Sequence, residues 1–349
     1  MEAGIHGGGS VRFGGLTPHT ERGCPRVCCP RFPQISPLRY ESDNMNFFER
    51  INLYKSILKP LINSSEGIKY QFLYMEPNLN YPEKIKRDDL HLISKIYTYG
   101  ILERSHLASI TSLARTIKWL ESTQQHILDG NLLGFSASLR GFLEASADSL
   151  DLMLHLPETI RKGLKLIYIQ LSQPSLLDKY SFSFEKIEEL LIHYSHARKV
   201  GKKESVPSSH INKTNADYIN KVEKFGVDKT YELYARLCEL THPASPSVMC
   251  FVDEIEQVMI LNFGKGQTLI NEILNEYSST LIKLMEYSIN SSLITLSYLN
   301  KIVPEWPTLP IKVLENIGNL KNNLDEFDVF VNELNEGSVD IEKLLTELA

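Results

Sequence analysis

Three polar residues near position 240 have the side chains that metal-independent phosphodiester chemistry uses. They are Arg236, Glu239 and His242, within the stretch YELYARLCELTHPASPSVM. Wound as a helix, they fall at i, i+3 and i+6 and can face one shared space. A guanidinium there would hold a phosphate, and an imidazole would accept a proton from a ribose 2′-hydroxyl or give one to a leaving oxygen. Arg236 and His242 are therefore candidate catalytic residues.

A proline determines where this helix is expected to end. Pro243 disfavours the helical conformation for the residue before it, so His242 should leave the helix and carry its imidazole outward. An imidazole at such a position exchanges protons near neutral pH. The alternative interpretation is an ordinary wet helix end, at which Arg236 and His242 are solvated or paired with Glu239.

A second polar pair lies earlier in the chain, in NLLGFSASLRGFLEASADSLDLML. Arg140 and Glu144 border an apolar helical stripe, at the edge where the interior of a bundle meets its surface. At i, i+4 the two side chains can pair with each other, which is the structural interpretation. The functional interpretation places Glu144 against Arg236 or His242, where it would orient the catalytic pair.

Together, the segments LRGFLE and RLCELTHP resemble the HEPN superfamily, small helical domains of bacterial toxins and phage-defence systems. The resemblance covers roughly 88–299 and is closest to the prokaryotic branch with an Arg-x-x-x-Glu helix and a later helix that closes on His-Pro. The family's motif of arginine, four to six residues and histidine falls on Arg236 and His242.

This resemblance implies a metal-independent ribonuclease centre that forms where two subunits meet. It therefore implies a homodimer, an RNA substrate and a cognate defence or antitoxin protein. Arg236 would anchor phosphate, His242 would act as acid and base, and Arg140, Glu144 and Glu239 would support them. Some members of the family act only as binding modules, so a non-catalytic helical interaction and dimerisation protein is the alternative.

Two other constellations have the spacing of metal ligands. Glu103 with His106, and Glu239 with His242, both have the Glu-x-x-His spacing of di-iron bundles, in which a residue such as Glu144 would complete the set. His193 and His196 resemble half of a zinc site without an obvious second half. The expectation from the sequence is nevertheless a site with no metal and no cofactor.

Composition limits the classes of protein that remain. A net charge of −6 disfavours a protein that coats nucleic acid by bulk electrostatics, and 42% hydrophobic residues among 349 suffice for a large core. No run of eighteen apolar residues predicts a membrane span. Three of the five cysteines lie before position 30, and Cys238 and Cys250 have apolar neighbours, which favours a reducing, cytoplasmic location.

The positioning elements are expected to be almost all helices. Residues 1–44, rich in glycine, proline and arginine, are predicted to be disordered and are either a native tail or not part of the native protein. An N-terminal helix and loop (45–87), a HEPN-like bundle (88–300) and a helical appendage (301–349) should follow. Apolar periodicity predicts an all-α bundle with helices at 46–63, 88–103, 105–128, 132–154, 158–172, 184–199, 215–225, 228–241 and 253–299, the last interrupted near Gly264 or Gly266.

Overall fold

The computed structural model of the chain describes residues 45–71, 87–177, 184–314, 317 and 319–348. The predicted disordered segment 1–44, with its three cysteines, lies outside these residues. Within them, the chain is all-α apart from one two-stranded sheet, which confirms the predicted fold class.

The elements follow one another along the chain with short connections. In order they are α1 (Phe47–Ser64), α2 (Arg87–Leu128), α3 (Leu132–Met153), α4 (Leu156–Ser172), η1 (Pro174–Leu177), α5 (Glu185–His196), η2 (Ser208–His210), α6 (Asn215–Lys224), α7 (Thr230–Thr241), α8 (Ser245–Met249), β1 (Val252–Ile255), β2 (Val258–Leu261), α9 (Lys265–Glu276), α10 (Ser278–Ile302), α11 (Ile311–Leu314), α12 (Leu320–Asn335) and α13 (Ile341–Leu348).

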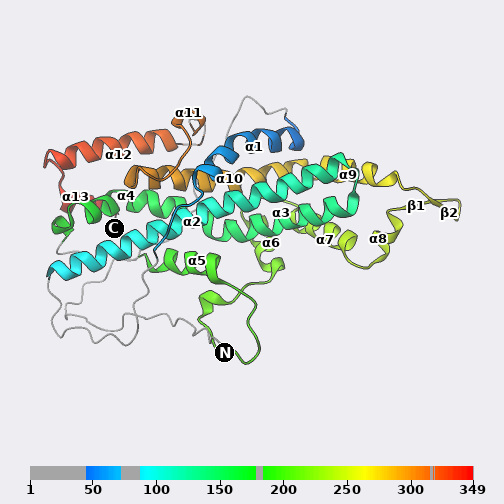
Figure 1. Ribbon diagram of the computed structural model, residues 1–349, viewed down its shortest axis with the longest axis horizontal. Helices are drawn as coiled ribbons and strands as arrows, with labels where there is room; N and C mark the ends of the chain where they lie inside the picture. The colour runs from blue at the N-terminus through cyan, green and yellow to red at the C-terminus, as the bar shows by residue number, and fades with distance from the viewer. Residues whose placement is uncertain (1–44, 72–86, 178–183, 315–316, 318, 349) are drawn as a thin grey trace.

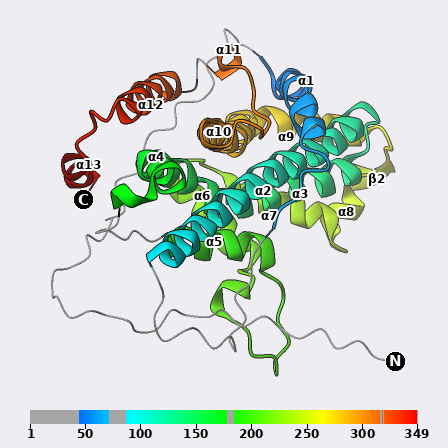
Figure 2. The same ribbon diagram turned by 60° about the vertical axis from the view of Figure 1, so that its left-hand side comes forward.

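The centre of the molecule is an elongated bundle in which α2, α3, α4 and α10 pack along one another (Figure 1). Helices α5, α6 and α7 cover one side of α3, and α1 lies against α2 and α10 on the other (Figure 2). One continuous hydrophobic core joins these helices to the C-terminal segment, from Phe47 to Leu344. None of the described helices has both the length and the apolarity that crossing a membrane requires.

Helix α2 runs through the position at which two separate helices were predicted, so the predicted break at Arg104 is wrong. The sequence there contains no proline or glycine that would stop a helix. Ser105 does not cap a new helix, because its hydroxyl donates to the Ile101 carbonyl oxygen, 2.7 Å away, within the same helix. The uninterrupted helix places residues from both predicted segments on one long rod.

The predicted helix at 253–299 is also wrong in its first part, where the chain forms an antiparallel hairpin. Strand β1 pairs with β2 through a two-residue turn at Glu256 and Gln257, whose φ angles are +49° and +69°. Positive φ at both central positions defines a type I′ turn, which sequences usually signal with Asn-Gly. The sequence lacks that signal, so the hairpin was not predicted.

A further break divides the rest of this segment into α9 and α10. Gly264 precedes α9, close to the interruption that was predicted, but a second interruption at Tyr277 was not. Tyr277 is buried and closes one helix while opening the next. Its hydroxyl donates to Glu232 of α7 over 2.9 Å, so this break brings the end of α9 to the candidate site.

Candidate functional site

The helix that carries the candidate residues, α7, is held by its leucine face. Leu233, Leu237 and Leu240 are buried, and the hydroxyl of Thr230 donates to the Val227 carbonyl oxygen at the start of the helix. Lys229, with φ of +62°, turns the chain into α7 just before it. The polar residues of α7 are therefore fixed on its two flanks and on its outer side.

His242 takes the position that the sequence predicted for it. It ends α7 with an extended backbone (φ −95°, ψ 158°), and its N–H donates to the Cys238 carbonyl oxygen over 2.9 Å. The residue is exposed, and within the described part of the chain its imidazole has no hydrogen-bond or ion-pair partner. Its ring is therefore accessible to a ligand from solvent.

Arg236 is engaged by a residue that the sequence did not indicate. Its guanidinium pairs with Glu276 at the end of α9, with Nη1 and Oε2 2.5 Å apart. Tyr277, next to Glu276, has a pKa raised to about 12, first by burial and then by the Glu232 carboxylate that accepts its hydrogen bond. Arg236 thus lies in a small cluster formed by α7 and the junction of α9 and α10.

Arg140 and Glu144 on α3 also reach α7, but not Arg236. Arg140 pairs with Glu144, with Nε and Oε1 3.3 Å apart, and donates to the Thr241 hydroxyl over 2.8 Å. The Tyr234 hydroxyl donates to Glu144 over 3.3 Å. Burial, then the neighbouring Cys238 and Glu144, raises the pKa of Tyr234 to about 12, so this hydroxyl stays protonated at neutral pH.

The two arginines lie on opposite flanks of α7. At about 100° per residue, Arg236 and Thr241 are about 140° apart around the helix, with the leucine face between them. The predicted contact of Glu144 with Arg236 or His242 is therefore wrong: Glu144 binds Tyr234 instead. Arg140 still bonds to the residue directly before His242, so it fixes the position at which the chain leaves α7.

Glu239 lies on the outer side of α7 and is exposed. Arg236 pairs with Glu276 and not with Glu239, although Glu239 is one turn away on the same helix. Among the described residues, no group of three or more histidine, cysteine or carboxylate side chains is arranged to hold a metal ion. The Glu-x-x-His pairs are accordingly not gathered into one site.

The other histidine pair has partners in the fold. His193 is buried, and its two ring nitrogens lie 3.0 Å from the Ser209 carbonyl oxygen and 2.7 Å from the Tyr218 hydroxyl. His196 stacks on His210, with ring centroids 5.6 Å apart. These contacts tie α5 to the segment before α6, which is a structural role.

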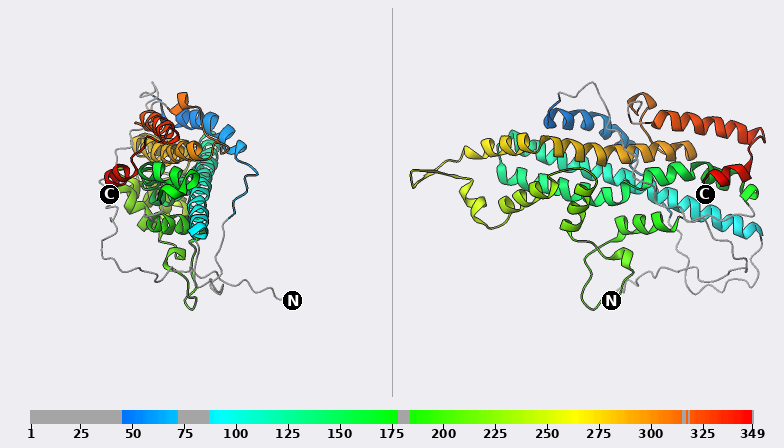
Figure 3. Two further views of the ribbon diagram at one scale, coloured as in Figure 1. Left: turned by 90° about the vertical axis from the view of Figure 1, so that its left-hand side faces the viewer. Right: turned by 180° about the vertical axis from the view of Figure 1, so that it is seen from behind.

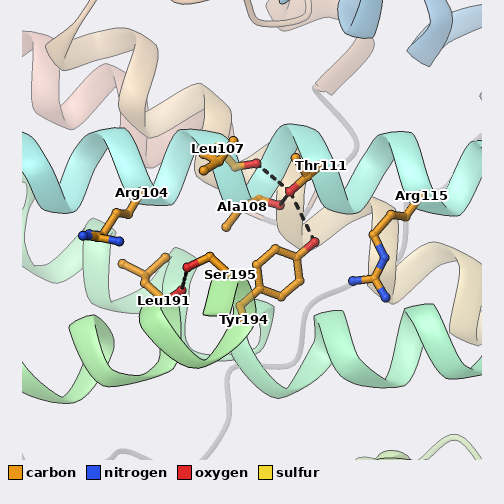
Figure 4. A pocket seen from close by; sticks show the side chains of 8 residues that line it. All are labelled: Arg104, Leu107, Ala108, Thr111, Arg115, Leu191, Tyr194 and Ser195. Carbon is orange, nitrogen blue, oxygen red and sulfur yellow. Dashed lines mark hydrogen bonds between the residues drawn. The ribbon is translucent and has the colours of Figure 1, made fainter. Parts of the chain in front are cut away.

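A cavity of about 270 Å³ lies between α2 and α5, away from α7 (Figure 4). Arg104 and Arg115 flank it, and the Thr111 and Tyr194 hydroxyls, 3.3 Å apart, lie between them. Arg115 already pairs with Asp148 at 2.7 Å and lies over the Tyr194 ring. One of the two cations is thus neutralised, and the cavity is a weaker candidate for an anion than the end of α7.

Comparison of the chain with protein-family models, curated protein sequences and solved structures gives no match. The resemblance to HEPN domains therefore depends on the residues quoted above and on their placement. The partners that the sequence did not indicate, Thr241, Glu276 and Tyr277, depend on the packing of distant helices. Only the pairing of Arg140 with Glu144, four residues apart, has a local signal in the sequence.

Proposed function

We propose that the protein is a HEPN-like effector that cleaves RNA without a metal ion, with Arg236 as phosphate anchor and His242 as acid and base. One observation carries the proposal. His242 ends α7 as an exposed residue whose imidazole has no partner among the described residues, six positions after an arginine. Six residues correspond to about 9 Å along a helix, a distance that a nucleotide and an arginine side chain can span together.

The ion pair of Arg236 is compatible with phosphate binding. Both side chains are partly exposed, 31% for Arg236 and 41% for Glu276, and exposed ion pairs contribute only about 0–1 kcal/mol to stability. An RNA phosphate offers the same bidentate geometry to the guanidinium as a carboxylate does. Phosphate would therefore displace Glu276 at a small cost in free energy.

The chemistry requires two proton transfers. His242 would take the proton of the ribose 2′-hydroxyl while its oxygen attacks phosphorus, and the 5′-oxygen would leave with a proton from a second donor. The products are a 2′,3′-cyclic phosphate and a 5′-hydroxyl. Because one subunit supplies one such imidazole at this helix end, a second copy of His242 is the proposed donor, as the resemblance to HEPN dimers implies.

The proposal predicts RNA cleavage by the purified protein in the presence of EDTA, with 2′,3′-cyclic phosphate ends. His242→Ala and Arg236→Ala should each reduce cleavage at least 100-fold, the order of magnitude of one acid or base catalyst. His210→Ala and Arg198→Ala, which change the same residue types elsewhere on the surface, should leave it unchanged. Electrophoresis and end-group analysis measure the products, and circular dichroism checks folding.

The nuclease assignment is abandoned if cleavage persists in either α7 variant or ceases equally in the control variants. The second candidate function is then a non-catalytic helical interaction protein. It is favoured by the contacts of Arg140, Glu144 and Arg236, each of which joins α7 to a neighbouring helix. Protein that forms dimers but leaves RNA intact would support it.

A further inference from the structure

The hairpin of β1 and β2 projects from the end of the bundle at which α7, α8 and α9 meet (Figure 3). All four residues of β2, Val258–Leu261, are exposed, and Leu261 is 70% exposed. Exposed apolar side chains continue on either side of the strand, at Val248, Ile255 and Phe263. A solvent-facing apolar patch of this kind is typical of an interaction site.

Neither face of the hairpin is covered by another element within the described residues. Residues opposite each other across the strands share a face, so Leu261 and Met259 lie on one face and Ile260 and Val258 on the other. All four are exposed, and an isolated two-stranded hairpin is only marginally stable in water. The strand also lacks the charges, prolines and bulges with which proteins usually protect an edge.

The hydrogen-bonding direction of β2 follows from its neighbours. The Asn262 N–H donates to the Phe251 carbonyl oxygen over 2.8 Å, just beyond the named strands. Bonded pairs alternate along an antiparallel ladder, so the N–H and C=O groups of Met259 and Leu261 face away from β1. These backbone groups are available to another strand.

We propose that this edge binds the β2 strand of a second copy of the chain, antiparallel and around a two-fold axis at Ile260. In this register Met259 pairs with Leu261 of the other copy, and Ile260 faces its own copy. Every side chain brought together is apolar, and β2 itself contains no charge. The mode of association is β-augmentation, with a four-stranded sheet shared by two subunits.

Charge selects β2 and not β1 as the paired edge. A two-fold axis through β1 would place Asp253 or Glu254 opposite its own copy, and like charges in opposed positions destabilise a sheet. The patch also has the size that a dimer needs. Seven apolar side chains expose on the order of 400 Å², and the apolar part of a standard interface is about 450 Å² per subunit.

The first test measures the mass of the full chain by analytical ultracentrifugation at micromolar concentration. We expect a dimer for the wild type, a monomer for Ile260→Lys and a dimer for Val329→Lys, which places the same charge on the exposed surface of α12. An equimolar mixture of Ile260→Lys and Ile260→Glu should restore dimers, because opposite charges then face each other on the axis. A monomeric wild type, or a dimeric Ile260→Lys, overturns the proposal.

The second test identifies the register. Ile260 would form a non-hydrogen-bonded pair with its own copy at a Cα separation of about 4.5 Å, which a disulfide can bridge. In the same register, two copies of residue 258 would lie about 14 Å apart. Ile260→Cys should therefore form disulfide-linked dimers on oxidation, and Val258→Cys should not exceed the wild-type background.

Equal cross-linking of the two cysteine variants would overturn the two-fold register. The inference deepens the proposed function only by supplying the second copy of His242, and it does not require RNA cleavage. A dimer that leaves RNA intact contradicts the nuclease but supports the hairpin interface. A monomer that cleaves RNA has the opposite meaning.

Discussion

His106 is an ionisable side chain enclosed in the interior of the bundle. Its Nδ1 lies 2.7 Å from the Tyr70 hydroxyl, and its ring centroid lies 4.6 Å from that of Trp306. Its Nε2 has no hydrogen-bond partner among the described residues. Burial lowers its pKa from 6.5 to about 4, because the charged form loses its hydration, so the imidazole is neutral in the folded protein at neutral pH.

This burial predicts a pH dependence of stability. The unfolded chain takes up a proton at His106 below about pH 6.5 and the folded chain only below about pH 4, so the unfolded state gains free energy as the pH falls between these values. The His106 contribution is complete above pH 6.5, and about 3 kcal/mol of it is lost by pH 4. Urea unfolding of the wild type and His106→Asn across this range measures the difference, which should narrow toward acid pH. Parallel curves would show that His106 is not held neutral.

The candidate site was predictable only where a signal is local. The sequence indicated that His242 would leave α7, because the constraint imposed by Pro243 acts on the adjacent residue. It also indicated that Arg140 and Glu144 could pair, because four residues separate them on one helix. The pairing of Arg236 with Glu276 was not predictable, since it depends on how α9 packs against α7.

At the scale of elements, α2 and α3 meet at a close approach that requires glycine. A Cβ atom at Gly141 would lie 2.7 Å from the ring of Trp119, whereas a Cβ at Gly100 would have nothing within 4 Å. Both glycines lie inside helices, so alanine would lower the entropy of the unfolded chain equally at each. The two positions therefore separate helix propensity from packing.

Gly141→Ala should destabilise the protein by about 1–3 kcal/mol, the usual cost of overpacking. Gly100→Ala should stabilise it by up to about 1 kcal/mol. Chemical denaturation of the two variants measures both effects, and adding Trp119→Leu to Gly141→Ala should recover part of the loss. Equal effects of the two alanines would mean that α2 and α3 do not pack as described.

Element type was predictable from apolar periodicity, but element boundaries depended on punctuation in the sequence. Asn46 and Glu49 form a capping box at the start of α1, with both bonds at 3.0 Å, and this helix was predicted to within one residue. The β hairpin was missed because Glu256 and Gln257 adopt conformations that glycine and asparagine usually supply. Four successive apolar residues in β2 also fit a helix as well as a strand.

At the scale of the whole molecule, one core connects segments that the sequence divided into separate regions. The buried pair of Arg50 and Glu286 joins α1 to α10, and Phe327 of α12 packs edge-on against Tyr168 of α4, with ring centroids 5.6 Å apart. The N-terminal helix and the C-terminal appendage are thus packed on the bundle. Long-range contacts of this kind have no signature in local periodicity.

We expect this shared core to unfold in a single transition. The two tryptophans report on different parts of it, since Trp119 lies at the contact of α2 and α3, and Trp306 lies in the segment after α10. In the single-tryptophan variants Trp119→Phe and Trp306→Phe, fluorescence and far-ultraviolet circular dichroism should give the same urea midpoint within each protein. An earlier fluorescence transition in Trp119→Phe, where Trp306 is the reporter, would mean that the C-terminal segment unfolds on its own.

The acidic character of β1 also limits how far such a protein can assemble. Once two β2 strands have joined, the outer borders of the composite sheet are the two β1 strands, each with Asp253 and Glu254. A further strand would meet carboxylates at either border, and charged borders deter the addition of more chains. The same hairpin that recruits one partner therefore turns away a third molecule, and growth stops at a closed pair instead of continuing into a fibre.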